Sequence, residues 1–441
     1  MTKAFNPGLK FPAKWTNGEL INPVSGILNG VWEQPRLAGY ADLFQYAAMA
    51  CDTAAFGGPD NFRHVGGASL DRDGAWIKAV GEGIERYCAA IYEPTDYPMC
   101  TRAEAPFDTV DLSLLSLYPE EITASDDFPF DAVDDAALIR WCPAQTLDGE
   151  ETHVPCAGVF VPWYYELATG ETPLFQPIST GLACHSSQAA ARLGGLMEVV
   201  ERDAFTSLWQ TRTPLTEIAT DALPPDSTEI LRRITATGAS VRIGFVPTDH
   251  GIPVCIAAQS IDSGRMPAFS LAASAGADPA DAVRKALEEL VHTFRWMARL
   301  NFSRRDFTPD AEFSNVVDQE THLLLWCDIA NRHRTKFLWS GDKVAYDTIT
   351  GINGDTPEAQ LLDADARVRA TGYTPLFVDL TTPDVAEFGF HVTRALVPGY
   401  NPLFMGHNLR SRTNPRLLKR LAERQEAQPD ATLNDYPHPF P

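Results

Sequence analysis

Several well-known nucleotide-binding and catalytic motifs are missing from this sequence. It has no GxxxxGK[ST] loop and no GxGxxG segment after a strand-like run, which argues against a P-loop ATPase and a Rossmann-type dinucleotide site. It also lacks HExxH, GxSxG and the protein-kinase signature set. Any nucleotide that binds here must therefore be held by carboxylate-bound magnesium, by arginines or by backbone donors.

The chain is also poor in positive charge, paired cysteines and long apolar runs. With 36 Lys and Arg against 58 Asp and Glu, its formal net charge is −22, which disfavours nonspecific binding to nucleic acid or to an anionic membrane. The eight Cys are scattered without CxxC spacing, which disfavours a zinc site and a disulfide framework. No apolar run reaches membrane-spanning length, and the first residues lack the core of a signal peptide. We expect a cytoplasmic protein.

The most informative feature that is present is a repeated acidic helix. The Ala-rich run from Gln188 favours a helix, and Ser186 or Ser187 can cap its first turn. A third expected helix, residues 279–300, carries Glu289 seven residues after an alanine. An ExxER pattern occurs on two of the expected helices. One copy is Glu82, Glu85 and Arg86 on an earlier helix, and the other is Glu198, Glu201 and Arg202 on the helix that begins near Gln188. In each copy, as for Glu289, the first glutamate lies seven residues after an alanine. Each helix follows a glycine-bearing segment.

A single ExxER pattern is most often a solvated helix face or an intrahelical salt bridge. Its repetition in one register favours a second interpretation, in which four or five glutamates converge. Such a cluster is unfavourable unless divalent cations neutralise it. Because no His or Cys stands at ligand spacing beside these glutamates, the expected ion is Mg²⁺, which usually bridges carboxylates to phosphates. The sequence therefore predicts a nucleotide–magnesium site.

The order of expected elements predicts a mixed α/β fold. Strand-like runs at residues 240–246, 254–261 and 268–275 follow one another directly, which favours antiparallel pairing. A short helix is expected at residues 43–50, and a Pro- and Asp-rich surface excursion at residues 93–135.

These motifs resemble those of the YcaO superfamily. Its members carry patterns close to SxxxExxER, S[N/T]GxA…ExxERDA and ALxExxQ. They correspond here to KAVGEGIER at residues 78–86, STGLA at 179–183 with EVVERDA at 198–204, and ALEELVH at 286–292. The resemblance covers roughly residues 60–441. It departs from the pattern at Lys78, where Ser is usual, and at His292, where Gln is usual.

The resemblance implies a YcaO-like fold of the α/β (mixed α+β) class, with helices packed on largely antiparallel sheets, and ATP and Mg²⁺ as cofactors. Residues 61–441 would form the catalytic domain, and residues 1–60 an N-terminal segment that is a candidate partner contact. By position, the implied magnesium ligands are Glu82, Glu85, Glu198 and Glu201. The implied nucleotide contacts are Lys78, Arg86, Thr180, Arg202, Glu289 and His292.

The last five residues read PHPFP. Alone, such a PxPxP tail is a polyproline II segment, usually disordered or a ligand for another domain. In the YcaO superfamily it resembles the azoline-forming branch, whose tail reaches the active site. This implies that the Pro441 carboxylate, or His438, handles protons. The implied reaction is ATP-dependent cyclodehydration of Cys, Ser or Thr in a ribosomally made precursor peptide to thiazoline or oxazoline.

The resemblance also implies partners. These are the precursor peptide, a separate E1-like protein that binds its leader, and in some systems an FMN-dependent dehydrogenase; a homodimer is a further option. No nucleic acid or membrane partner is expected. Two alternatives stay open: a thioamide- or amidine-forming enzyme that uses the same activation with another nucleophile, and a non-catalytic ATP-binding accessory subunit.

Overall fold

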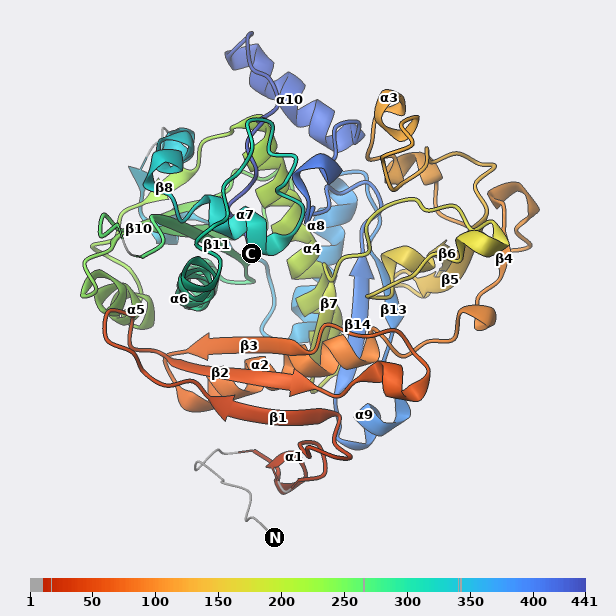
Figure 1. Cartoon of the computed structure of the whole chain (residues 1–441), viewed down its shortest axis with the longest axis horizontal. Helices are drawn as coiled ribbons and strands as arrows, with labels where there is room; N and C mark the ends of the chain where they lie inside the picture. The colour runs from red at the N-terminus through yellow and green to blue at the C-terminus, as the bar shows by residue number, and fades with distance from the viewer. Residues whose placement is uncertain (1–10, 17, 265, 340, 342) are drawn as a thin grey trace.

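The structure is a computed structural model of the whole chain, and it describes residues 11–16, 18–264, 266–339, 341 and 343–441 (Figure 1). These residues form three β-sheets, in which every strand pair except β8–β12 is antiparallel. The first sheet has the order β1-β2-β3, with β1 (Leu28–Glu33), β2 (Phe44–Ala50) and β3 (His64–Ser69).

The second sheet has the order β11-β10-β9-β8-β12. Its strands are β8 (Thr216–Ile218), β9 (Ser240–Phe245), β10 (Val254–Ser260), β11 (Phe269–Ala275) and β12 (Lys343–Val344). The third sheet has the order β4-β5-β13-β14-β7, with β6 paired to β5. Its strands are β4 (Met99–Cys100), β5 (Ile139–Gln145), β6 (Glu151–Pro155), β7 (Leu182–His185), β13 (Leu376–Asp379) and β14 (His391–Leu396).

The α-helices cover and connect these sheets (Figure 1). The three longest in the described residues are α2 (Arg72–Cys88), α4 (Gln188–Thr211) and α6 (Pro279–Ser303). The others are α1 (Ala13–Thr16), α3 (Glu120–Thr123), α5 (Pro225–Thr235), α7 (Gln319–Leu325), α8 (Pro357–Ala370), α9 (Pro383–Glu387) and α10 (Pro415–Ala427). None of the helices described is both long and apolar enough to cross a membrane.

The three longest helices close a ring of β–α units. The edge strands β3, β7 and β11 each lead into a long helix: β3 into α2, β7 into α4 and β11 into α6. Each helix also packs against the edge strand of the next unit, so that α2 contacts β7, α4 contacts β11 and α6 contacts β3. The carboxylates predicted to converge therefore lie on helices that meet around one centre.

Local sequence sets the start and the close packing of these helices. The Ser187 side chain accepts a hydrogen bond from the Ala190 N–H and caps α4. Asp278 caps α6 in the same way, and Pro279 occupies its first turn. On α4, Gly195 is required because a Cβ there would lie 2.5 Å from the Gly181 carbonyl oxygen. Gly195 thus permits close approach of the α4 backbone to the loop before β7.

The predicted mixed α/β fold is confirmed, and one local prediction is wrong. The expected strands before residue 276 are β9, β10 and β11, and the expected helix at 279–300 is α6. Residues 43–50, predicted as a helix, instead form β2, which pairs with β1 on one side and β3 on the other. The alanines that favour a helix here were overridden by strand pairing, because β2 is the central strand of its sheet. Strands β1 and β2, from the predicted N-terminal segment, share that sheet with β3.

Candidate functional site

Glu85 and Glu201, on two of the three long helices, have pKa values that burial and neighbouring carboxylates raise. Burial raises the pKa of Glu85 well above its usual range, and the neighbouring Glu198 and Glu82 raise it further. Burial also raises the pKa of Glu201 to about 8; Arg202 opposes this shift, whereas Glu198 and Glu289 add to it. Five glutamates from three helices are thus gathered at one place, as the repeated pattern predicted.

Backbone N–H groups from the edge strands and the loops beside them orient these carboxylates. Glu82 accepts from Gly66 N at 3.2 Å, and Glu198 accepts from Gly181 N at 3.3 Å, each from its own unit. The second glutamate of each pair reaches the next unit: Glu85 accepts from Cys184 N at 2.8 Å, and Glu201 accepts from Ala275 N at 3.0 Å. Edge strands have outward N–H groups without a sheet partner, so these carboxylates satisfy donors that need one.

Two arginines provide the positive charge nearest to the glutamates. Arg86 pairs with Glu82 at 3.2 Å one turn away on α2. Arg202 lies 3.3 Å from Glu198 and 3.6 Å from Glu201 on α4. Both side chains are less than a fifth exposed, which strengthens their electrostatic effect on any anion that enters the ring.

Lys78 is held by a buried glutamate that the sequence analysis did not single out. Its ammonium lies 2.7 Å from Glu288 and donates to the Ala68 carbonyl oxygen at 3.1 Å. Glu288 is 1% exposed and also pairs with Arg284 at 2.8 Å. It accepts from Ser69 Oγ as well, so that it ties α6 to β3. The lysine at the usual serine position therefore serves this contact, and its charge is already engaged.

Thr180 and His292 each lie beside a glycine whose N–H orients a glutamate. Thr180 immediately precedes Gly181, whose N–H orients Glu198, and it also lines a neighbouring cavity. The His292 ring lies against Gly66, where a Cβ would be 2.5 Å from its Cε1 atom. Its buried Nδ1 has no hydrogen-bond partner among the residues described. The structure thus places His292 beside the backbone that orients Glu82.

The C-terminal tail, residues 434–441, runs along α4 toward these glutamates. Asn434 contacts Gln210 and Trp209 near the end of the helix. Further along the tail, the Phe440 ring lies 4.4 Å from that of Phe205, and Arg202 donates to the Pro441 oxygen at 3.1 Å. Successive residues of the tail thus contact α4 at positions progressively nearer its N-terminus. The last residue therefore reaches the arginine that contacts Glu198 and Glu201.

Side chains hold the tail mainly through its carbonyl oxygens. Trp209 donates to Tyr436 O at 2.8 Å, Trp326 to Pro437 O at 3.2 Å and His322 to His438 O at 3.0 Å. Because proline has no N–H to donate and a polyproline segment has no internal hydrogen bonds, such carbonyl contacts are how this segment is fixed.

The His438 side chain forms hydrogen bonds that help to hold the tail in place. Its Nε2 donates to the Phe404 carbonyl oxygen at 2.8 Å, and its Nδ1 accepts from Phe440 N at 3.3 Å. The side chain is fully buried, and burial lowers its pKa well below the usual range, with His322 adding to the effect. With both ring nitrogens engaged, this geometry favours a role in holding the tail over the proton transfer that the sequence suggested.

The free energy of unfolding is expected to fall on acidification, because His322, which contacts the tail, is buried. Burial lowers the pKa of His322 to about 4 from its ordinary 6.5. Between these values the unfolded chain binds a proton that the folded chain does not, so stability present above pH 6.5 is lost as the pH falls toward 4, by about 3 kcal/mol for this group alone. Urea denaturation at a series of pH values measures this. The His322→Asn variant should show a shallower dependence, whereas the exposed-surface variant His333→Asn should match the parent protein.

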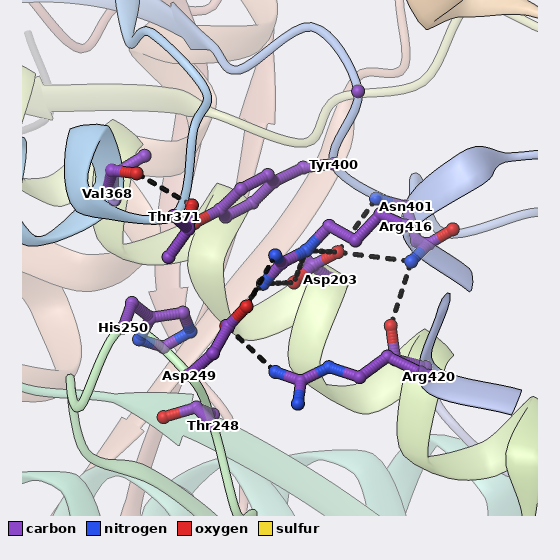
Figure 2. Close-up of polar contacts among 12 residues, drawn as sticks. Asp203, Thr248, Asp249, His250, Val368, Thr371, Tyr400, Asn401, Arg416 and Arg420 are labelled. Atoms are coloured by element: carbon purple, nitrogen blue, oxygen red, sulfur yellow. Dashed lines mark hydrogen bonds and ion pairs between the residues drawn. The ribbon is translucent and has the colours of Figure 1, made fainter. Parts of the chain in front are cut away.

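A buried ion-pair network joins α4 to α10 (Figure 2). Arg416 of α10 contacts both Asp203, at 2.9 Å, and Asp249, at 2.7 Å. Asp203 also accepts from the backbone and side-chain amides of Asn401, and Arg420 pairs with Asp249 at 2.8 Å. Asp203 follows the second ExxER pattern directly. The network therefore fixes the helix that carries Glu198 and Glu201 to the segment that leads into the tail.

The family comparison agrees with this geometry. Residues 66–401, most of the chain, match the family described as YcaO cyclodehydratase, ATP- and Mg²⁺-binding. The chain belongs to the YcaO family. An uncharacterized protein of Methanothermobacter thermautotrophicus is 28% identical to it over 354 residues, which are 78% of this chain and 85% of that protein.

Solved YcaO-like structures share its fold. A heterocyclase in complex with substrate and cofactor superposes with a TM-score of 0.73 at 19% identity and covers 96% of this chain. The chain spans 56% of that heterocyclase. YcaO from Methanopyrus kandleri, bound with AMPPCP and Mg²⁺, superposes with a TM-score of 0.63 at 17% identity, covering 87% of this chain and 89% of its own.

The donor set of this YcaO protein fits the cofactors of its family, ATP and Mg²⁺. Oxygen-only ligands suit Mg²⁺, and burial together with neighbouring carboxylates raises the pKa values of Glu85 and Glu201, effects that a bound cation would offset. Within the part of the chain that the structure describes, no three His, Cys, Asp or Glu side chains are arranged to hold a metal ion by themselves. Mg²⁺ usually completes its coordination with water and substrate phosphates, so carboxylates that leave positions open are compatible with a nucleotide-bound ion.

Proposed function

We propose that this protein is an ATP-dependent cyclodehydratase that converts Cys, Ser or Thr in a ribosomally made precursor peptide to thiazoline or oxazoline. The observation that carries the proposal is the contact between Arg202 and Pro441, at 3.1 Å, beside the paired glutamates. It brings the PxPxP tail, which resembles that of azoline-forming relatives, to the same arginine that faces the expected magnesium site. The family relationship supports ATP-dependent chemistry at that site.

The reaction requires an amide oxygen to leave. The thiol sulfur of Cys, or the hydroxyl oxygen of Ser or Thr, would add to the preceding backbone carbonyl and give a hemiorthoamide. ATP would supply the phosphoryl group that turns the former carbonyl oxygen into a leaving group. Loss of phosphate, with the amide proton passing to a base, would form the C=N bond of the azoline ring. The balance is one ATP consumed and one peptide oxygen transferred to phosphate.

The roles of the chain's own residues follow from their positions. Glu82, Glu85, Glu198 and Glu201 would hold magnesium, because their backbone contacts fix their orientation. Arg86 and Arg202 would neutralise charge on the transferring phosphoryl group. Glu289 lies near Glu201 and His292 lies against Gly66, and with Thr180 they would contact the nucleotide. The Pro441 carboxylate would accept protons from the attacking side chain and the amide.

Partner proteins are part of the proposal. This chain spans 56% of the heterocyclase whose structure it resembles. We propose a separate E1-like protein that binds the peptide leader, and residues 1–60 as its candidate contact. An FMN-dependent dehydrogenase would act afterwards if azolines are oxidised to azoles.

A thioamide- or amidine-forming activity is the second candidate, because the acidic site alone serves any of these reactions. The hydrogen bonds that hold the tail beside α4 favour the azoline reaction. A non-catalytic accessory role would leave the gathered carboxylates without a chemical task.

Mass spectrometry separates azoline formation from thioamide formation and from a non-catalytic accessory role. The protein would be incubated with ATP, Mg²⁺, a Cys-containing precursor peptide from a neighbouring reading frame and the matching leader-binding protein. We expect the peptide to lose the mass of one water for each residue cyclised, together with phosphate release that depends on the peptide. Replacement of oxygen by sulfur would instead show a thioamide synthetase. ATP binding without phosphate release or any change in peptide mass would show an accessory protein.

A further inference from the structure

A cavity of about 130 Å³ lies beside the acidic ring. It is shared by the β14 region, the loop that follows β14, and parts of the excursion between α2 and α4. Thr180 and Val199, the neighbours of Gly181 and Glu198, contribute to its wall. The cavity therefore adjoins the site proposed for phosphoryl transfer.

Most of the cavity wall is apolar. Leu114, Tyr118, Phe175, Leu396, Leu403 and Phe404 are among the side chains that line it. A space of this size is on the order of the apolar cavities that hold a benzene ring. Such walls suit a hydrocarbon side chain and disfavour a phosphate group or a hydrated ion.

Three buried polar side chains interrupt this wall, and each has an atom without a hydrogen-bond partner among the described residues. Arg394 is 3% exposed and donates through Nη2 to Ile178 O at 2.8 Å, while its Nε and Nη1 have no partner. Asn401 and Ser411 are each 1% exposed, and the Asn401 Oδ1 and Ser411 Oγ atoms also have none. All three residues line the cavity. Buried polar groups are nearly always paired, so a set without partners around one cavity calls for a ligand or ordered water.

The kind of ligand follows from the donors and acceptors. Arg394 offers N–H donors, and Asn401 Oδ1 offers an acceptor. A peptide unit carries one C=O and one N–H, and so it can satisfy both. A carboxylate or phosphate would pair with Arg394 but would meet the Asn401 oxygen with no proton to share. The apolar space remaining would accept the side chain of the same residue.

We propose that this cavity binds an apolar residue of the peptide substrate, with Arg394 and Asn401 pairing with its backbone amide groups. The assignment to the substrate rests on the proposed peptide-modifying function. The position of Arg394 supports it, because this residue pairs with Leu182 in the sheet, next to the Gly181 N–H that orients Glu198. A side chain held here would position the neighbouring residue of the peptide near the acidic ring.

Binding of capped amino acids to the full chain, without nucleotide, tests the pocket. The probes are N-acetyl-leucine N-methylamide, the matching glycine compound and N-acetyl-leucine with a free carboxylate, followed by ligand-observed NMR. We expect roughly millimolar binding of the leucine amide, with the glycine amide and the free acid at least about tenfold weaker.

Three variants locate the binding. Leu114 is half-buried on the cavity wall, so Leu114→Trp should fill the cavity and abolish binding of the leucine amide. Leu418→Trp is the matched control, because Leu418 is 44% exposed on α10, and it should bind like the parent protein. Arg394→Lys should weaken binding at least about tenfold with little change in circular dichroism, because it keeps the charge but removes the forked donors.

The outcomes separate the pocket from the catalytic proposal. Absence of leucine-amide binding, equal binding of the glycine amide, or full binding by Leu114→Trp would overturn the pocket and indicate a cavity that holds water only. Tighter binding of the free acid would overturn the peptide-amide assignment. If the leucine amide binds as expected but no precursor peptide is cyclised, the pocket stands while the proposed reaction fails.

Discussion

Glu201→Gln is expected to lower ATP turnover by on the order of 10²- to 10³-fold while the protein stays folded. The proposed metal ligand loses its charge, but the glutamine oxygen can still accept the Ala275 N–H that now lies 3.0 Å from Glu201. Because burial raises the pKa of Glu201 to about 8, glutamine replaces a group that is largely uncharged at neutral pH before a cation binds. Peptide-dependent phosphate release measures turnover, and the melting temperature measures folding.

Glu229→Gln is the matched control for this experiment. Glu229 lies on α5 and pairs at the surface with Arg232 and Arg233, so the same change in charge is made away from the acidic ring. Its turnover should equal that of the parent protein. Near-normal phosphate release by the Glu201 variant would falsify the magnesium assignment.

Addition of two glycines after Pro441 is expected to slow peptide cyclisation by on the order of 10²-fold or more, and to leave ATP binding nearly unchanged. The contacts of Trp209, Trp326 and His322 hold the tail upstream of its last residue, so the added residues should not unseat it. They would convert the carboxylate near Arg202 into an amide and move the charge away from the site. Cyclisation is followed by mass spectrometry, and binding is measured with a non-hydrolysable ATP analogue.

The same two glycines placed before Met1 provide the control for the extension. This variant should cyclise the peptide at the parent rate, because it leaves the contact between Arg202 and Pro441 intact. Equal rates for the two extended proteins would remove the tail carboxylate from the mechanism. A loss of ATP binding in the C-terminal extension would instead assign the tail to the nucleotide site.

The sequence was sufficient to predict that the glutamates meet, because helical periodicity and an equal offset from alanine place them on corresponding helix faces. It was not sufficient for the contacts that orient them. The bond from Ala275 N to Glu201 joins residues on different β–α units, and nothing local indicates it. Glu288 was missed for the same reason: beside Glu289 it is one more acidic residue on a helix, until the packing of α6 on β3 buries it against Lys78.

The remaining differences between expectation and structure also reflect long-range contacts. Residues 43–50 have helix-favouring composition, but they are needed as the middle strand between β1 and β3. The PxPxP motif indicated a role for the tail but not the carbonyl contacts that fix it, since those come from α4 and α7. The cavity near Arg394 depends on residues far apart in the chain, and only the folded structure brings them together.

The closed order of the three β–α units also has a consequence for synthesis on the ribosome. α2 relies on a donor from β7, α4 on one from β11, and α6 returns to β3, so an emerging chain could not close the ring of three units until α6 had left the exit tunnel. The tail, residues 434–441, lies further along the chain than α6. Nascent fragments that end before α6 would thus lack Glu289 and the contact that closes the ring.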